Sequence, residues 1–300
     1  RGGTHERYML RGDPNFVWPH DIILNADYGY YTDHFSHRLG RLDKKTGEVK
    51  EFPFEPPPGT GRQPFRQVAG EIGFPGRPGA GPHELLFDSQ GRPIIGMAGA
   101  TVRFDPKTET FTSWTPGDGM FGLTPDDHVW VVEDDGPLHR LDTSTGKVDE
   151  FMLPKMDGIY DIEADNKGRA IVDVWGNGFL RVFDPATKKH TDYPTPTPGS
   201  GPRRGDMDSK NNHWVALYWA GALARFNSDT GEVKEYPLVP GSKPFGPPFA
   251  SPYSAAVDEK NQLAWTTDFN NGRIYSFRSE EHTSELQSHL NLVCRLLLEK

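Results

Sequence analysis

The sequence is poor in cysteine, in long apolar runs and in positive charge. Its 300 residues include one cysteine, Cys294, so cysteine usage gives no sign of a disulfide framework. No uninterrupted apolar run is long enough to cross a bilayer, so we expect no membrane span. The formal net charge of −9 disfavours nucleic acid as a partner. The sequence also lacks a nucleophile elbow, a P-loop, a dinucleotide fingerprint and a zinc motif.

What the sequence does contain is a repeated phrase. An apolar strand ends in "RLD", "RFD" or a variant, and a turn with a second strand such as "TGEVKEF" follows. Aligned anchor residues lie 37 to 62 residues apart: Leu42, Phe104, Leu141, Phe183, Phe226 and Phe277. Repeats of this length, built from short strands and Gly, Asp, Asn and Pro turns, are typical of β-propeller blades. We therefore predict an all-β fold, a β-propeller of four-stranded antiparallel blades, as one domain over residues 1–277.

Six blades are visible, and the two ends of the repeat region are irregular. Residues 6–10 read as an orphaned outer strand, which either closes the ring with the sixth blade or follows a missing one. We expect seven blades in the intact protein. A Pro- and Gly-rich insertion at about residues 56–81 predicts a long loop.

The C-terminal stretch breaks the repeat pattern. Arg278 to His289 resembles a translated sequencing adapter, so we interpret residues 278–300 as a non-native end of a metagenome-type bacterial gene fragment. A natural C-terminal helix is the alternative, because the last residues have helical leucine spacing.

Two positions in each repeat are expected to face the central channel. The first follows a Pro, Ile or Met at the opening of the blade and is occupied by His20, His83, Phe121, Tyr160, Arg203 and Tyr253. The second closes the following strand and is occupied by Asp33, Met97, Glu133, Asp173, Leu217 and Asp268.

The carboxylates at the second position predict a metal site. Asp33, Glu133, Asp173 and Asp268 would repel one another on one level of a narrow channel unless they were protonated, solvated or neutralised by a cation. Carboxylate and water oxygens suit Mg²⁺, with Ca²⁺ as an alternative. The competing interpretation is that these carboxylates are solvated in a water-filled channel.

The residues at the first position predict catalysis and binding. His20 and His83, on the neighbouring level, have a side chain suited to general base or acid work near neutral pH. Tyr160, Arg203, Tyr253 and Phe121 are expected to contact substrate. Asp21 and Glu84 each follow an opening histidine and could orient it.

Other conspicuous residues have structural explanations. Matching inner-strand tryptophans are expected in the core: Trp130, Trp214 and Trp265. The aspartates before each turn are expected to bind nearby backbone N–H groups: Asp43, Asp105, Asp142 and Asp184.

The repeats resemble those of the virginiamycin B lyase (streptogramin lyase) family over Glu6 to Phe277. The likeness rests on "PHDIILNADYGYYTDHFSHRLGRLD" with "EVKEFPF", and on "SPYSAAVDEKNQLAWTTDFNNGRIYSF". It implies a seven-bladed propeller that opens a cyclic depsipeptide ester by elimination, using Mg²⁺, channel-facing glutamates and histidine. His20 matches the family's histidine, and Asp33 stands where the glutamate would be. His83 has Met97 as its partner and Glu133 has Phe121, so no blade carries both residues. This departure argues against true streptogramin lyase activity.

The sequence leaves three functions open. One is a divalent-metal-assisted carbon–oxygen lyase acting on an ester or cyclic peptide-like substrate. The second is a lactonase-like, metal-dependent hydrolase. The third is a non-catalytic propeller that binds protein or carbohydrate. We expect a monomer with a small-molecule or peptide-like ligand in the channel mouth. The family resemblance implies a periplasmic or secreted location.

Overall fold

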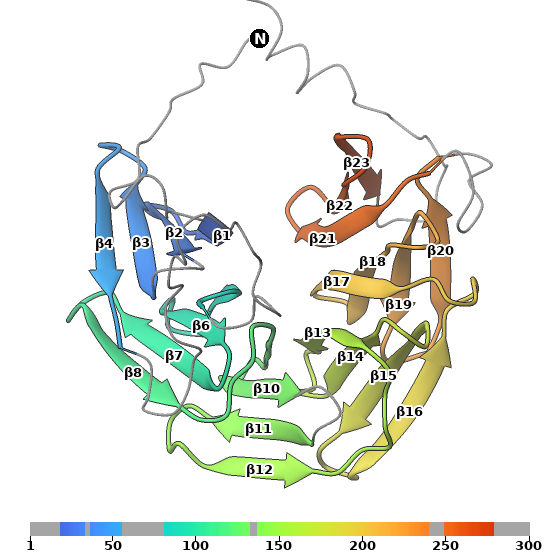
Figure 1. Cartoon of the computed structure of the whole chain (residues 1–300), viewed down its shortest axis with the longest axis horizontal. Coiled ribbons are helices and arrows are strands. Elements are labelled where there is room, and N and C mark those ends of the chain that lie inside the picture. The colour runs from blue at the N-terminus through green and yellow to red at the C-terminus, as the bar shows by residue number, and fades with distance from the viewer. Residues whose placement is uncertain (1–18, 34–36, 56–80, 133–136, 240–248, 279–300) are drawn as a thin grey trace, which may run out of the picture. The chain divides into compact units, whose positions relative to one another are not determined.

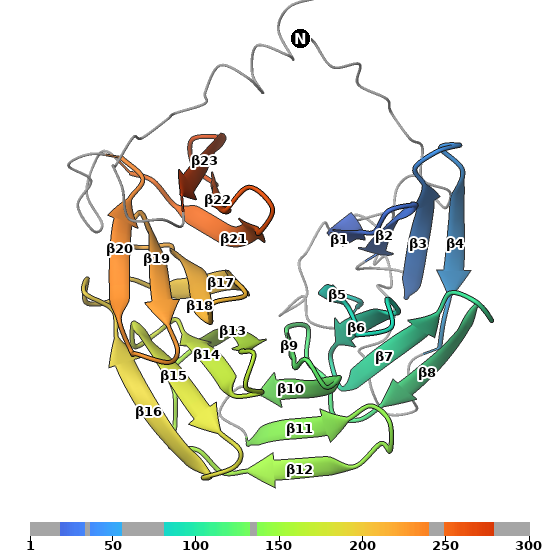
Figure 2. The same cartoon turned by 180° about the vertical axis from the view of Figure 1, so that it is seen from behind.

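The computed structural model describes residues 19–33, 37–55, 81–132, 137–239 and 249–278. Over these residues the chain forms 23 strands and no helix (Figure 1, Figure 2). Consecutive strands pair antiparallel into six separate sheets, five with four strands and one with three. This confirms the predicted fold class of antiparallel propeller blades. None of the described residues belongs to a helix able to span a membrane.

The chain divides into two compact units. The N-terminal unit holds His5–Glu133 and Leu138–Glu150. The C-terminal unit holds Phe151–Lys300 together with the short segments Arg1–Thr4 and Asp134–Pro137. Each unit contributes three sheets.

The N-terminal unit contains the first three sheets. The first consists of β1 (Pro19–Leu24), β2 (Tyr28–Asp33), β3 (Arg38–Asp43) and β4 (Val49–Pro53). The second consists of β5 (Leu85–Phe87), β6 (Pro93–Met97), β7 (Ala100–Asp105) and β8 (Thr110–Trp114). The third consists of β9 (Gly122–Leu123), β10 (His128–Val132), β11 (Leu138–Asp142) and β12 (Val148–Phe151), which ends at the unit boundary.

The C-terminal unit contains the other three sheets. The fourth consists of β13 (Ile159–Ala164), β14 (Ala170–Val174), β15 (Phe179–Asp184) and β16 (Lys189–Pro194). The fifth consists of β17 (Pro202–Met207), β18 (Asn212–Leu217), β19 (Ala222–Asn227) and β20 (Val233–Pro237). The sixth consists of β21 (Pro252–Asp258), β22 (Leu263–Asp268) and β23 (Arg273–Arg278).

Within each unit the core lies between successive sheets, because the second strand of a sheet is buried on both faces. In the C-terminal unit, Ile171 and Leu180 of the fourth sheet pack with Val215 and Phe226 of the fifth. Two of the three predicted core tryptophans, Trp130 and Trp214, are fully buried, and Trp265 is half-buried.

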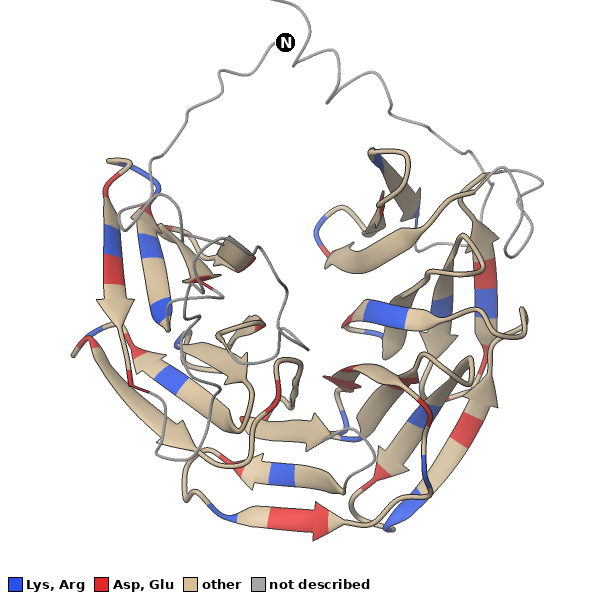
Figure 3. Ribbon diagram, viewed as in Figure 1, with Lys and Arg blue, Asp and Glu red and all other residues tan. Residues whose placement is uncertain are grey.

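The predicted turn aspartates are confirmed. Asp43 Oδ1 accepts hydrogen bonds from the N–H groups of Lys45 and Thr46, 2.8 and 2.9 Å away. The other three make the same pair of bonds two and three residues ahead: Asp105, Asp142 and Asp184. Figure 3 shows that outer strands β4 and β20 each carry a basic residue beside an acidic one, Lys50–Glu51 and Lys234–Glu235.

Three sequence-based expectations lie wholly or almost wholly outside the described residues. They are the orphaned strand at residues 6–10, the insertion at about 56–81 and the C-terminal stretch, of which only Arg278 is described, at the end of β23.

Candidate functional site

A bulge marks the start of the innermost strand in four sheets. The register shifts directly after the first residue pair of each strand, at Pro19/Ile22, Ile159/Asp161, Pro202/Gly205 and Pro252/Ala255. Bulges re-aim side chains and are common beside functional sites. The residue just inside each bulge is one that the sequence predicted to face the channel: His20, Tyr160, Arg203 and Tyr253. We call this place the opening position.

Arg203 lies among four aromatic rings of the C-terminal unit. Its guanidinium carbon is 3.7 Å from the ring centre of Tyr253 and 4.3 Å from that of Tyr160. The rings of Tyr218 and Trp175 follow at 5.0 and 5.3 Å, so all four lie within cation–π range. Arg203 Nη2 also donates a hydrogen bond to Tyr160 Oη at 2.6 Å. The opening residues of three successive sheets therefore contact one another.

Further aromatic side chains extend this cluster toward solvent. One aromatic residue directly follows the second strand of each sheet in the C-terminal unit: Trp175, Tyr218 and Phe269. The Trp175 ring centre is 5.2 Å from that of Trp219, which is 40% exposed. Phe269 is 67% exposed and stacks on Tyr253 with ring centres 5.8 Å apart. The guanidinium is thus surrounded by a partly exposed aromatic surface.

The two phenols beside Arg203 interact with each other. Their hydroxyl oxygens are 3.4 Å apart. Burial, together with the hydrogen bond to Tyr253, raises the pKa of Tyr160 to about 12. Burial also acts to raise the pKa of Tyr253, but the hydrogen bond from Tyr160 and the charges of Arg203 and Arg204 lower it below the ordinary value. Among the described residues, the Arg203 guanidinium therefore contacts phenols and no carboxylate.

In the N-terminal unit the opening position holds two histidines. The ring centres of His20 and His83 are 3.7 Å apart, with the planes tilted by 36°. Thr32 joins the two sheets here, because its hydroxyl accepts from the Asp21 N–H and donates to the His83 carbonyl oxygen. The structure brings together the two residues predicted as general bases, and their catalytic role stays a prediction.

Gly119, in the segment before β9, lies beside the His83 ring. A Cβ built on Gly119 would lie 3.2 Å from His83 Cγ, so the glycine leaves room for that ring. Phe121, the residue predicted here from sequence, stands two residues later and is fully buried with Val129 and Leu141.

The acidic residues next to the opening position join successive sheets. Asp21 Oδ2 accepts a hydrogen bond from Leu85 N, and Asp161 Oδ2 accepts one from Gly205 N. Glu84 Oε2 accepts in the same way from Phe121 N. The sequence suggested that Asp21 and Glu84 orient the histidines, whereas these bonds tie each carboxylate to the backbone of the next sheet. Each is a latch between neighbouring sheets.

The latch in the C-terminal unit belongs to a buried ionisable network. His213 Nε2 lies 2.9 Å from Asp173 Oδ1, and both side chains are fully buried. Burial and the nearby charge of Asp173 raise the pKa of Asp161 to about 7. Burial raises the pKa of Asp173 as well. For His213, burial lowers the pKa, but the charge of Asp173 and the hydrogen bond to it prevail, so the pKa rises.

Two of the four predicted metal ligands have other partners. Asp268 Oδ1 accepts hydrogen bonds from Ser251 N and Asn270 N at 3.0 and 3.2 Å, which holds the chain at the end of β22. Asp173 is bound to His213. It also stands one residue before Val174, whose register matches that of Asp33 and Asp268. Because successive side chains of a strand point to opposite faces, Asp173 faces away from the side that the sequence alignment gave it.

Of the other two predicted ligands, only Asp33 is described. Asp33 is buried at the end of β2, and Glu133 lies outside the described residues. Among the described residues, no group of three or more His, Cys, Asp or Glu could hold a metal ion. The described residues therefore do not fit a shared Mg²⁺ or Ca²⁺ site.

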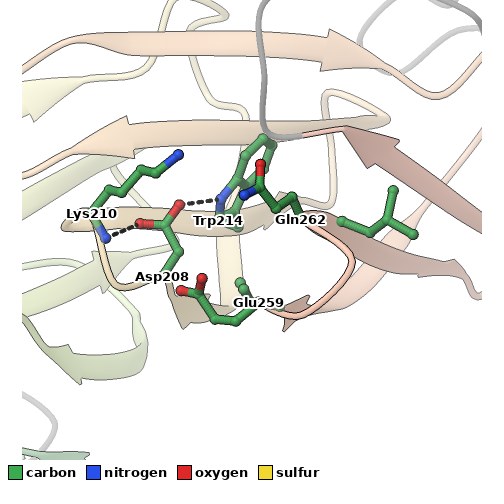
Figure 4. A pocket seen from close by; sticks show the side chains of 7 residues that line it. Asp208, Lys210, Trp214, Glu259 and Gln262 are labelled. Atoms are coloured by element: carbon green, nitrogen blue, oxygen red, sulfur yellow. Dashed lines mark hydrogen bonds between the residues drawn. The ribbon is translucent and has the colours of Figure 1, made fainter.

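A small pocket lies elsewhere in the C-terminal unit (Figure 4). Its volume of about 20 Å³ is enough for roughly one water molecule. The lining Asp208 is already bonded to Lys210 N and to Trp214 Nε1, and Glu259 accepts from Ser209 N. This cavity is too small and too internally satisfied to be the ligand site.

Sequence reasoning found the opening residues but missed the residues around them. The aromatic residues after the second strands carry a signal in "VDVW", "VALY" and "TTDF", each just past a strand end. Nothing in the sequence marks His213 as the partner of Asp173, because they lie 40 positions apart on different sheets.

Comparison with known proteins supports the fold. No protein-family model and no curated protein matches the sequence. The structure is similar to virginiamycin B lyase from Staphylococcus aureus, with a TM-score of 0.68, 17% identity, and 92% of this chain and 87% of that chain covered. A streptogramin B lyase gives 0.64 at 18% identity, covering 89% and 87%. The WD40 repeats of RRP9 give 0.67 at 10% identity, covering 90% and 78%. The chain therefore has the β-propeller fold of these two lyases, a fold that WD40-repeat proteins share.

Proposed function

We propose that this chain is a streptogramin-lyase-like propeller that binds a small or peptide-like ligand at the Arg203 cluster. The cluster is defined here as Tyr160, Trp175, Arg203, Tyr218 and Tyr253. One observation carries the proposal: Arg203 is surrounded by four aromatic rings and makes a single side-chain hydrogen bond among the described residues. Flat rings with a few directed polar groups are typical of small-ligand sites.

The reaction favoured by the similar structures is a carbon–oxygen elimination that opens an ester. A base takes a proton from carbon, the C–H electron pair forms a double bond, and the C–O bond breaks to release a carboxylate. His20 and His83 are the described residues best suited to be the base, because histidine titrates near neutral pH. No step is assigned to Mg²⁺, since Asp173 and Asp268 are committed to His213 and to backbone amides.

Product analysis tests the reaction. The full chain would be incubated with a streptogramin B-type cyclic depsipeptide and with a simple lactone, and the products analysed by mass spectrometry. Elimination gives a product of unchanged mass with a new double bond, whereas a lactonase-like hydrolysis adds one water. We expect His20→Asn and His83→Asn to lower the rate by roughly 100-fold or more, the usual contribution of a general base.

A control and a second outcome complete this test. His190→Asn, on exposed β16, should leave the rate unchanged. Unaltered substrate that still binds, with binding lost in Arg203→Met, would favour the non-catalytic binding propeller. Loss of activity in EDTA that Mg²⁺ restores would support the metal prediction and point to ligands beyond those described.

A further inference from the structure

Arg203 differs from three other arginines of its unit, which pair with carboxylates. Arg169 pairs with Asp165, and Arg181 binds Asp192 through Nε at 2.6 Å. Arg225 lies 3.9 Å from Glu232. Arg203 forms no ion pair with a described residue. Among the described residues, its half-buried guanidinium contacts aromatic rings and donates a hydrogen bond to the Tyr160 hydroxyl.

The hydrogen-bonding capacity of Arg203 is largely unused. Its Nη2 donates to Tyr160, but its Nε is buried with no hydrogen-bond partner among the described residues. A buried donor without an acceptor is costly, and a guanidinium edge matches the two oxygens of a carboxylate. An anionic acceptor is therefore the group that would complete this site.

The rings around Arg203 define what lies next to that anion. The rings of Tyr160 and Tyr253 lie closest to the guanidinium of Arg203. The edge of the guanidinium is therefore the part that an approaching anion can contact. Trp175, Tyr218 and the 40% exposed Trp219 pack together beside it, with ring centres 4.8 to 5.3 Å apart. This surface suits a planar apolar group by stacking.

We propose that the Arg203 cluster recognises an aromatic carboxylate, with the acid on the guanidinium edge and the flat ring on the Trp175–Tyr218–Trp219 surface. This names the ligand class of the binding site under the proposed function and rests on it.

Calorimetric titration of the full chain with a matched ligand pair tests this inference. The probes are 2-naphthoate and its neutral amide, 2-naphthamide, which share the ring and differ in charge. We expect the carboxylate to bind the wild type roughly 10- to 100-fold more tightly, the range for losing a charge-assisted hydrogen bond. Arg203→Met should abolish this preference. Trp175→Leu should weaken both probes by a similar factor.

Two further variants separate a local effect from misfolding. Arg203→Lys keeps the charge but lacks the planar edge, so it should retain only part of the preference. Arg225→Met removes an arginine elsewhere in the unit and should leave both affinities unchanged. The free tripeptide Ala-Ala-Trp and its C-terminal amide show whether the acid can be the end of a peptide or must belong to a free aromatic acid.

The inference fails if both naphthyl probes bind equally, if neither binds at millimolar concentration, or if folded Arg203→Met keeps the preference. These outcomes differ from failure of the proposed function. A carboxylate preference without turnover of any ester would retain the ligand class and reject the lyase. Turnover of an ester without a carboxylate preference would support the lyase and reject the ligand class.

Discussion

The two units use the same backbone feature for different chemistry. Each carries its conspicuous side chains where the innermost strand begins. In the N-terminal unit this place holds His20 against His83, and in the C-terminal unit it holds Arg203 between Tyr160 and Tyr253. The fold fixes where these residues stand, and the residue types decide whether the place suits proton transfer or stacking and ion pairing.

The latches show a second difference between the units. In the N-terminal unit, Glu84 Oε2 accepts its hydrogen bond from the Phe121 N–H of the next sheet. In the C-terminal unit, Asp161 makes the equivalent bond and also lies beside the buried pair of Asp173 and His213. Burial and the charge of Asp173 raise the pKa of Asp161 to about 7, so the C-terminal latch is sensitive to pH as well as to packing.

The largest expected effect comes from glycines that face a histidine ring in each unit. A Cβ on Gly205 would lie 2.1 Å from His213 Cε1, inside a fully buried ring that is bonded to Asp173. We expect Gly205→Ala to lower the free energy of unfolding by about 3 kcal/mol in urea denaturation. A Cβ on Gly119 would lie 3.2 Å from His83 Cγ, and the His83 ring is only half-buried and can shift. Gly119→Ala should therefore lower the free energy of unfolding by less than about 1 kcal/mol. Equal losses would contradict this comparison.

Removal of a latch is expected to cost somewhat less. Glu84→Ala leaves the Phe121 N–H without its carboxylate acceptor, so unfolding free energy should fall by about 2 kcal/mol. Glu84→Gln keeps an acceptor oxygen and serves as the control, with less than half of that loss. A Glu84→Ala variant as stable as the wild type would show that the latch contributes nothing.

The pH dependence of stability should come from the C-terminal unit. Folded Asp161, with its pKa at about 7, keeps a proton that unfolded aspartate loses near 3.8. The folded state therefore binds more protons in this window, and stability should fall as pH rises from about 4 to 7. The slope should reach at most about 1.4 kcal/mol per pH unit for this group.

Variants in both units check the origin of this slope. Asp173, Asp206 and His213 also have raised pKa values and act in the same direction, so Asp161→Asn should flatten the slope without removing it. Glu84→Gln, in the other unit, should leave the slope as it is. Unfolding curves at several pH values distinguish these results, and a wild type whose stability increases from about pH 5 to 7 would refute the assignment.

The smallest effect is expected at an exposed ion pair. Lys167 Nζ lies 2.6 Å from Asp229 Oδ1, with the lysine side chain 59% exposed. Lys167→Met should change the unfolding free energy by no more than about 0.5 kcal/mol, and the change should disappear in concentrated salt. A larger or salt-independent change would mean that this pair belongs with the buried network and not with the surface.

The sequence by itself determined the fold class and most of the opening residues. The spacing of the "RLD" phrases predicted the sheets, since each repeat must bury its strands against its neighbours. His20, Tyr160, Arg203 and Tyr253 could be found because each stands at a fixed place in a local pattern of strand and turn. The turn aspartates followed for the same reason, as their bonds reach only two or three residues.

Only the tertiary structure decided which of these residues act together. The register of β14 places Val174, and not Asp173, at the position that Asp33 and Asp268 occupy in their strands. Asp173 therefore faces the other side of its strand and contacts His213. No local pattern fixes this register, because the bulge that sets it depends on pairing with the next strand. The contact of Arg203 with Tyr160 and Tyr253 likewise joins three sheets. Local sequence therefore set the elements, and packing between sheets set the site.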